Sequence, residues 1–241
     1  MAHFQLEWNR IIQAYSNLIR NSKEGKYDND NWGESWNEDV RAFQRQFKCP
    51  EDDVHGFYGL SESCRRTILQ SDQYPSGYAV YDINRDGILE LLVLSEIIEP
   101  HNYVITDPDN WDIKERIYEY VYNIDAIFTL NKGKPIMLGA YYHRCGCSLI
   151  PDGTLYVFPS WGCSPYENRA YILPPGSTEL RLIEKRISFG GANGDEFYIE
   201  KEGVRTNFGS GDEFFAMEPY PRGWPDDPIF QLDLTFVPIA P

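Results

Sequence analysis

Residues 118–130 have the sequence YEYVYNIDAIFTL, and this stretch sets the fold class because its apolar and aromatic side chains recur at every second position. The even-numbered residues from Tyr118 to Leu130 are all apolar or aromatic. Successive side chains of a β-strand point to opposite faces, so a period of two predicts a strand here. Tyr and Phe are also favoured in half-buried strands.

Glycine-containing turn signals divide the chain beyond this strand. They are Asn131-Lys132-Gly133, Pro151-Asp152-Gly153, Pro174-Pro175-Gly176, Asn193-Gly194 and Glu202-Gly203. Apolar runs between such turns are typical of an antiparallel meander. We therefore expect strands at residues 78–81, 89–94, 135–142, 154–158, 170–173, 179–189, 197–201, 204–208 and 229–237.

The N-terminal part of the chain has a different period. Apolar residues recur at helical spacing over residues 4–19, which predicts a first helix. A second helix is expected from Ser35, which forms a capping box with Glu38, to a stop at Pro50. A short third helix is expected at residues 62–70.

These periods together predict an α+β protein. A helical N-terminal region, residues 1–70, packs on a mainly antiparallel β unit, residues 75–241, and the two form one compact domain. The β unit is expected to be a sandwich or a partly open barrel.

The charge of the chain restricts its partners. It carries 37 acidic residues against 22 Lys and Arg, a formal net charge of −15. This charge repels phosphate backbones and excludes nucleic acid as the expected partner. An acidic surface suits solubility, a divalent cation or a basic protein partner.

The sequence also bears on location. No apolar run reaches the roughly 20 residues that a membrane span needs, and the N-terminal stretch has no apolar signal core. We therefore expect a cytoplasmic protein. The alternative is an extracellular or cell-surface protein whose leader has been removed.

The segment with the clearest chemistry is residues 82–90, DINRDGILE. Side-chain oxygens stand at its first, third, fifth and ninth positions, in Asp82, Asn84, Asp86 and Glu90, and a glycine follows the third of them. The seventh residue, Ile88, would offer its backbone carbonyl. Calcium prefers about six to eight oxygen ligands, so this spacing predicts a Ca²⁺ site formed by these five residues.

This spacing resembles the first half of an EF-hand loop, but Val93 stands where an EF-hand has its bidentate Glu. With strands expected on both sides, the loop is more similar to the strand-loop-strand calcium loops of FG-GAP-like repeats. Residues 78–93 also resemble a group of uncharacterised Firmicutes proteins with one such loop, and the similarity continues at residues 127–135 and 152–156. This resemblance implies a small β domain and calcium, and no known reaction. An Asx-rich turn without metal is the alternative interpretation.

A second group of candidate ligands consists of His143, Cys145, Cys147 and Cys163. On a strand the first three would share one face, which suits zinc, and Cys163 would suit a disulfide with that face. Ordinary packing is the third interpretation. The total of five cysteines does not favour a closed disulfide framework.

We therefore expect a calcium-stabilised, non-enzymatic binding module with a protein partner. No nucleophile elbow or phosphate loop is present in the sequence, and we assign no catalytic residues. The alternatives are a cytosolic interbacterial immunity protein that neutralises a basic toxin, and a hydrolase of unknown substrate.

Overall fold

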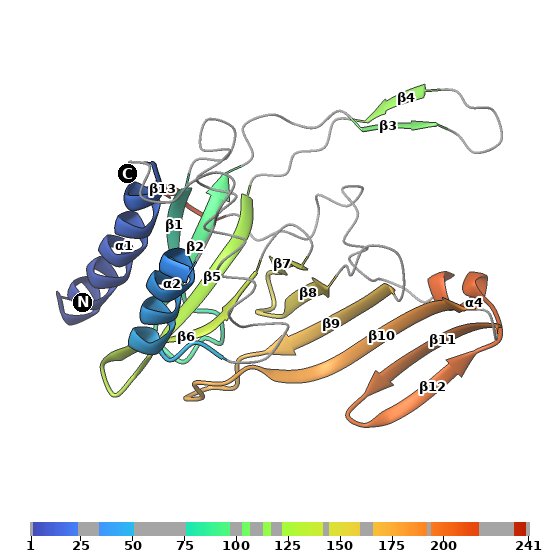
Figure 1. Ribbon diagram of the computed structural model, residues 1–241. Coiled ribbons are helices and arrows are strands. Elements are labelled where there is room, and N and C mark those ends of the chain that lie inside the picture. Colours follow the sequence, from blue (N-terminus) through green and yellow to red (C-terminus); the bar gives the residue numbers. More distant parts are fainter. Residues whose placement is uncertain are drawn as a thin grey trace.

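The computed structural model describes residues 2–23, 34–50, 76–96, 103–106, 113–116, 122–141, 145–159, 166–191, 194–216 and 234–239. These residues form an α+β fold with two large antiparallel sheets (Figure 1). The helices are α1 (Ala2–Lys23), α2 (Glu34–Phe47) and α4 (Gly211–Ala216). The strands are β1 (Ser76–Tyr81), β2 (Glu90–Glu96), β3 (Tyr103–Thr106), β4 (Ile113–Arg116), β5 (Tyr122–Asn131), β6 (Lys134–Ala140), β7 (Cys145–Leu149), β8 (Leu155–Pro159), β9 (Tyr166–Ile172), β10 (Arg181–Gly191), β11 (Gly194–Lys201), β12 (Val204–Phe208) and β13 (Val237–Pro238).

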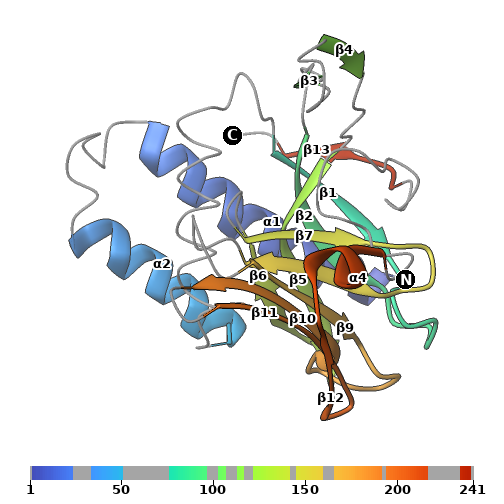
Figure 2. The same ribbon diagram turned by 90° about the vertical axis from the view of Figure 1, so that its right-hand side faces the viewer.

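The two large sheets differ in their topology. The first sheet has the order β13-β1-β2-β5-β6, and the second is a meander with the order β12-β11-β10-β9-β8-β7. Strands β3 and β4 form a separate hairpin. Figure 2 shows β7 crossing the strands of the first sheet, whereas β10, β11 and β12 extend away from it in Figure 1. The described strands thus form two large sheets and a separate hairpin, and not a barrel.

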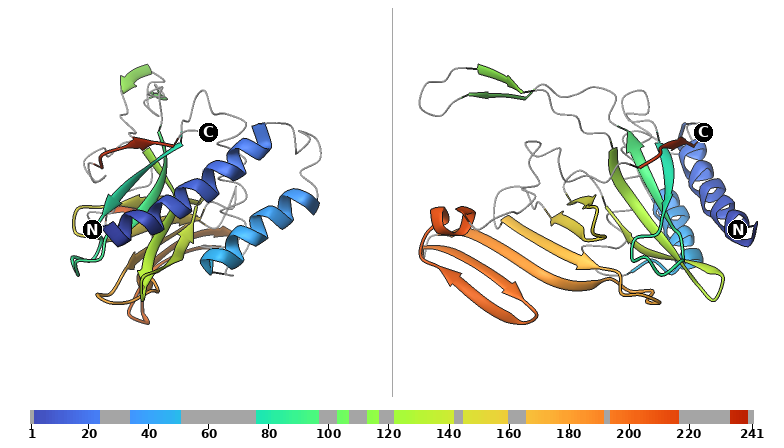
Figure 3. Two further views of the ribbon diagram at one scale, coloured as in Figure 1. Left: turned by 90° about the vertical axis from the view of Figure 1, so that its left-hand side faces the viewer. Right: turned by 180° about the vertical axis from the view of Figure 1, so that it is seen from behind.

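Helices α1 and α2 cover the outer face of the first sheet (Figure 3). The helical period brings Trp8, Ile11 and Tyr15 onto the buried side of α1. Helix α2 ends at Phe47, where Lys48 adopts a left-handed φ of 51° and the Cys49 N–H donates to the Gln44 carbonyl at 3.0 Å. This C-terminal cap stops the helix before Pro50.

Two cores lie on the two faces of the first sheet. The helix-side core joins α1 and α2 to one face of the sheet, through residues that include Phe43, Phe47 and Phe128. The inter-sheet core joins the other face to β7, β8 and β9, through residues that include Leu92 and Leu155. The order of layers is therefore helix, sheet, sheet, with both faces of the first sheet covered.

The position of β5 between these cores modifies the period-two pattern. Residues 124–130 are all buried, since both faces of the strand are covered. The register with β2 shifts between Val93 and Leu94, which leaves Asp125 as a bulge and places Ile124 in the inter-sheet core, whereas Ala126 belongs to the helix-side core. The predicted strand is confirmed for residues 122–130, and residues 118–121 lie outside the described residues. One even-numbered residue, Ile124, faces the other core.

Most predicted elements are confirmed, with bounds that differ by a few residues. Helix α2 begins at Glu34, so Ser35 lies inside the helix and not before it. The prediction of one long strand at residues 229–237 is wrong for its described part, because only Val237 and Pro238 pair there, with β1. A proline cannot donate to the ladder and shortens such an edge strand. The predicted helix at residues 62–70 lies outside the described residues.

Several elements had no counterpart among the predictions. The short strands of the β3–β4 hairpin and helix α4 were not expected. No helix in the described ranges is both long and apolar enough to cross a membrane.

Candidate metal centre

Residues 82–89 connect β1 to β2 and contact two turns of the second sheet. The Arg85 guanidinium donates from Nη2 to the carbonyl of Pro151 in the β7–β8 turn, at 3.3 Å. The Gly176 N–H, in the β9–β10 connection, donates to Oδ2 of Asp86 at 2.7 Å. The predicted loop therefore lies where the two sheets meet.

Asp82 and Asp86 hold the backbone of the loop. Oδ1 of Asp82 accepts from the Asp86 N–H at 3.0 Å, and its Oδ2 accepts from the Gly87 N–H at 2.9 Å. Oδ1 of Asp86 accepts from the Ile88 N–H at 2.8 Å. The Asp86 bond to Ile88 closes an Asx turn, whereas Asp82 accepts from N–H groups four and five residues further along the loop. The three oxygens in these bonds each keep a second lone pair for another donor or a cation.

The amide of Asn84 joins the loop to the second sheet as well. Its Nδ2 donates to Oδ2 of Asp86 at 3.0 Å and to the Pro174 carbonyl at 3.3 Å, and its Oδ1 accepts from the Asp86 N–H at 3.2 Å. Burial alone would raise the pKa of Asp86, but the hydrogen bonds from Gly176, Ile88 and Asn84 outweigh it and hold that pKa below its usual value.

Glu90 is the buried acid of the group, with no exposed surface. Its Oε2 accepts from the Ile83 N–H at 2.9 Å, and its Oε1 accepts from the Thr129 hydroxyl at 2.9 Å. Burial raises the pKa of Glu90 to about 7, and the charges of Asp86 and Asp82 act in the same direction. The three carboxyl groups therefore interact, and this interaction contributes to the raised pKa of Glu90.

A backbone contact fixes the loop against the β7–β8 turn. Gly153 has a φ of 90°, and a Cβ at this residue would lie 2.3 Å from the carbonyl oxygen of Ile83. Ile83 itself is buried in the inter-sheet core. Only a glycine satisfies both the conformation and the close approach.

The loop offers oxygen atoms, which are the ligands that a hard cation such as Ca²⁺ prefers. Within the described ranges, no Lys or Arg forms an ion pair with Asp82, Asp86 or Glu90, since Arg85 donates to a backbone carbonyl instead. In the same ranges, no three His, Cys, Asp or Glu side chains gather as a metal-binding group. A cation at this loop would therefore need the oxygens of Asn84 and Ile88 in addition to the acids.

The other predicted ligands are only partly described. Cys147 is buried in the inter-sheet core, and Cys145 lies two residues before it on β7. His143 and Cys163 lie outside the described residues, so the zinc and disulfide alternatives stay predictions.

The prediction from sequence missed three residues that complete the site. Thr129, Gly153 and Gly176 contact the loop from strand β5 and from two turns. The two glycines were visible in the sequence only as turn signals. No pattern in the sequence around Thr129 indicates that its hydroxyl contacts Glu90.

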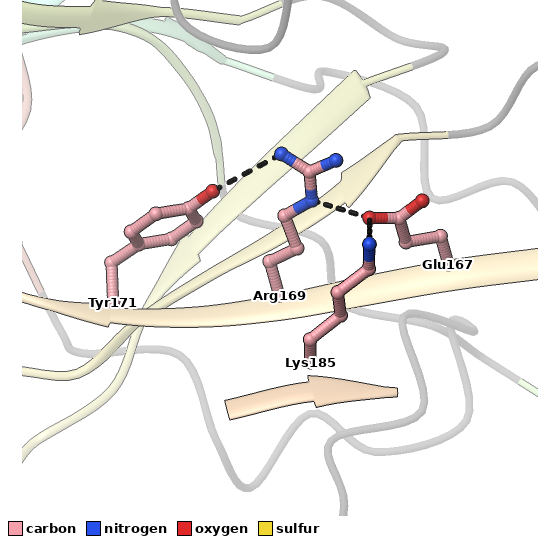
Figure 4. Close-up of polar contacts among 4 residues, drawn as sticks. All are labelled: Glu167, Arg169, Tyr171 and Lys185. Atoms are coloured by element: carbon pink, nitrogen blue, oxygen red, sulfur yellow. Dashed lines mark hydrogen bonds and ion pairs between the residues drawn. The ribbon is translucent and has the colours of Figure 1, made fainter. Parts of the chain in front are cut away.

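A second polar cluster lies on β9 and β10, apart from the loop (Figure 4). Oε1 of Glu167 is 2.5 Å from Nε of Arg169 and 3.3 Å from Nζ of Lys185, and Nη1 of Arg169 donates to the Tyr171 hydroxyl at 3.5 Å. All four side chains are at least two-thirds buried. The cluster pairs one acid with two cations, which indicates a structural ladder between neighbouring strands.

The comparisons with known proteins give no further guide to function. No family model, curated protein or solved structure matches this chain. The resemblance of residues 78–93 to the Firmicutes proteins therefore stays a prediction, and function has to be inferred from the site.

Proposed function

We propose that this protein is a calcium-stabilised, non-enzymatic interaction module. In this proposal the ion is held by the carboxylates of Asp82, Asp86 and Glu90, the amide oxygen of Asn84 and the backbone carbonyl of Ile88. The observation that supports it best is that the fully buried Glu90 feels the charges of Asp82 and Asp86, without an ion pair from any of the three to Lys or Arg in the described part of the chain. A divalent cation would supply the missing positive charge.

The position of the loop gives the ion a structural role. Hydrogen bonds link Asn84, Arg85 and Asp86 to two turns of the second sheet. A cation that orders these residues would stabilise the contact between the sheets as well as the loop. It would also offset the cost of ionising Glu90 inside the protein.

The charge of the chain supports a basic protein as the partner. A net charge of −15 favours association with a positively charged surface and disfavours nucleic acid. The ion in this proposal stabilises the binding surface and takes no part in a reaction.

Thermal unfolding in millimolar calcium and in excess chelator tests the proposal. Ligand at about 100 times its dissociation constant adds roughly 2.7 kcal/mol of stability. Each kcal/mol moves the unfolding midpoint of a chain of this size by about 2–4 °C, so we expect calcium to raise the midpoint by roughly 5–10 °C. Magnesium should raise it much less, because it dehydrates reluctantly and demands stricter geometry.

Matched variants connect this shift to the loop. Asp82→Asn and Asp86→Asn keep an oxygen acceptor but remove a charge, and each should reduce the calcium shift to near zero. Asp152→Asn is the control, because Asp152 caps the neighbouring turn through the Thr154 N–H at 2.8 Å and is not a proposed ligand. Equal midpoints in calcium and chelator for the unmodified protein would reject the calcium site and leave the Asx-rich turn as the interpretation.

The excess of acidic residues also favours a second candidate, an immunity protein that neutralises a basic toxin. Binding to such a toxin should weaken steeply with salt, because the attraction is between opposite net charges. Protection of cells that express the product of a neighbouring toxin gene would support this function. Protection that persists in Asp82→Asn would show that it does not depend on calcium.

A further inference from the structure

Strand β12 is an edge of the second sheet, and no described strand or helix covers that edge. It pairs with β11 on one side only. Its residues 204–207 are exposed, and Val204 retains 69% of its surface. Figures 1 and 3 show β12 at the end of the sheet that is farthest from α1 and α2.

The other edges of the two large sheets are blocked. Strand β13 is two residues long and includes Pro238, and β6 begins with Lys134 and Pro135. Strand β7 packs against β5 of the first sheet. Short strands, prolines and lysines are common means by which proteins prevent pairing at an edge. The sequence of β12, VRTNF, contains no Pro, no Lys and no register shift.

The hairpin geometry shows which backbone groups of β12 face outward. Glu202 and Gly203, with φ of 50° and 79°, form a two-residue turn, so Lys201 and Val204 are the hydrogen-bonded pair beside it. Hydrogen-bonded and non-hydrogen-bonded pairs alternate along an antiparallel ladder. Arg205 and Asn207 therefore direct their N–H and C=O groups to the open edge.

We propose that a second copy of this chain pairs antiparallel with β12 about a two-fold axis at Thr206. This register places Arg205 opposite the partner's Asn207, so that their outward backbone groups bond. It also places Thr206 opposite the partner's Thr206, and the exposed Val204 opposite the partner's Phe208. Apolar and Thr–Thr pairs of this kind stabilise antiparallel strands. The meander β7–β12 then continues into the second copy.

One neighbouring register lacks this complementarity. Shifting the pairing by one hydrogen-bonded pair in one direction places Arg205 opposite the partner's Arg205, which sets like charges together. In the proposed register Arg205 meets a neutral amide. Its guanidinium already lies 3.6 Å from the Tyr198 ring centroid and donates to Oδ1 of Asn207 at 2.7 Å, so the side chains on this face are ordered before association.

On the face of β12 opposite to Arg205, apolar side chains add to the proposed contact between the two copies. Phe208 packs against Phe214 of α4, with ring centroids 5.6 Å apart, and Phe197 joins this cluster at 5.7 Å from Phe214. The partner's Val204 would extend this apolar cluster across the axis. Five-residue strands make a small interface, so we expect a dissociation constant in the micromolar range.

Sedimentation equilibrium over a range of concentrations tests the dimer. The unmodified protein should convert from monomer to dimer as its concentration rises through the micromolar range. Thr206→Lys places two positive charges at the axis and should weaken dimerisation at least tenfold, whereas Thr206→Val should dimerise at least as well as the unmodified protein. Identical association of the Lys and Val variants, or a monomer at every soluble concentration, would overturn the proposal.

Cysteine cross-linking tests the register independently. Thr206→Cys places two thiols opposite each other in a non-hydrogen-bonded pair, where disulfides form readily. We expect this variant to give a covalent dimer on mild oxidation, well above the background from the five native cysteines. Asn207→Cys faces the partner's Arg205 and should stay near the background. Equal cross-linking of the two variants would reject the proposed register.

Discussion

Glu90 shows how a single residue depends on the fold around it. Its side chain is fully buried and its two oxygens accept hydrogen bonds from Ile83 and Thr129. Nothing in the spacing of residues 82–90 distinguishes it from an exposed ninth ligand. The strand β5 that brings Thr129 to it is what converts this acid into a buried group with a raised pKa.

The pKa of Glu90 predicts a pH dependence of stability without calcium. Between its usual value of 4.5 and about 7, the folded protein binds a proton that the unfolded chain has lost. The free energy of unfolding should therefore fall as pH rises through this interval, by an amount on the order of 3 kcal/mol, and become flat above it.

Urea unfolding in chelator, across that pH interval, measures this effect. Glu90→Gln has no proton to lose, so the difference between the unmodified protein and this variant isolates the titration of Glu90. Calcium should reduce the slope, because the ion favours the ionised carboxylate. Parallel pH profiles for the two proteins would show that the pKa of Glu90 is not raised.

Gly153 gives a second prediction at the scale of one residue. Gly153→Ala adds a Cβ that would lie 2.3 Å from the Ile83 carbonyl oxygen, in a left-handed conformation. We expect a loss of about 2–4 kcal/mol in the free energy of unfolding, from strain and from separation of the loop and the turn. Gly176→Ala is the control, because its φ is 71° and no atom lies within 4 Å of its added Cβ. Its cost should be only about 1 kcal/mol.

At the scale of elements, the ladder of Glu167 with Arg169 and Lys185 joins β9 to β10. Glu167→Gln leaves two partly buried cations without a carboxylate, and we expect a loss of about 1–2 kcal/mol in chemical denaturation. Glu196→Gln is the matched control. Its ion pair with Arg205, at 3.4 Å, has side chains that are 63% and 45% exposed, and its loss should be below about 0.5 kcal/mol. Equal losses would show that the largely buried ladder contributes no more than a surface pair.

One repeated tetrapeptide marks the limit of prediction for elements. Gly194-Asp195-Glu196-Phe197 begins strand β11, whereas Gly211-Asp212-Glu213-Phe214 lies in helix α4. The same four residues therefore adopt two different secondary structures. The second copy is a helix because Phe214 packs against Phe197 and Phe208 and the Glu213 N–H bonds to the Ser210 hydroxyl. Long-range packing thus overrode the local likeness.

For the whole molecule, Phe128 joins the helical layer to the first sheet. It is fully buried, with its ring centroid 6.2 Å from Phe43 and 5.7 Å from Phe47. Phe128→Ala should lower the free energy of unfolding by about 3–5 kcal/mol, because it removes a large side chain from a closed core. Val80→Ala, on the same sheet but 39% exposed, should cost about 0.5 kcal/mol or less. Urea unfolding measures both, and similar losses would show that the helical layer does not depend on this contact.

The sequence by itself determined the α+β class, the helical N-terminal region, the antiparallel strands and the composition of the loop at Asp82–Glu90. Each of these follows from local periods or from spacing within nine residues. Only the tertiary structure decided that the loop joins two sheets, since its hydrogen bonds to Pro151 and Gly176 span 66 and 90 residues of chain. The burial of Glu90 and the open edge at β12 were likewise decided only by the tertiary structure. They depend on which strands become neighbours, and a local pattern carries no information about that choice.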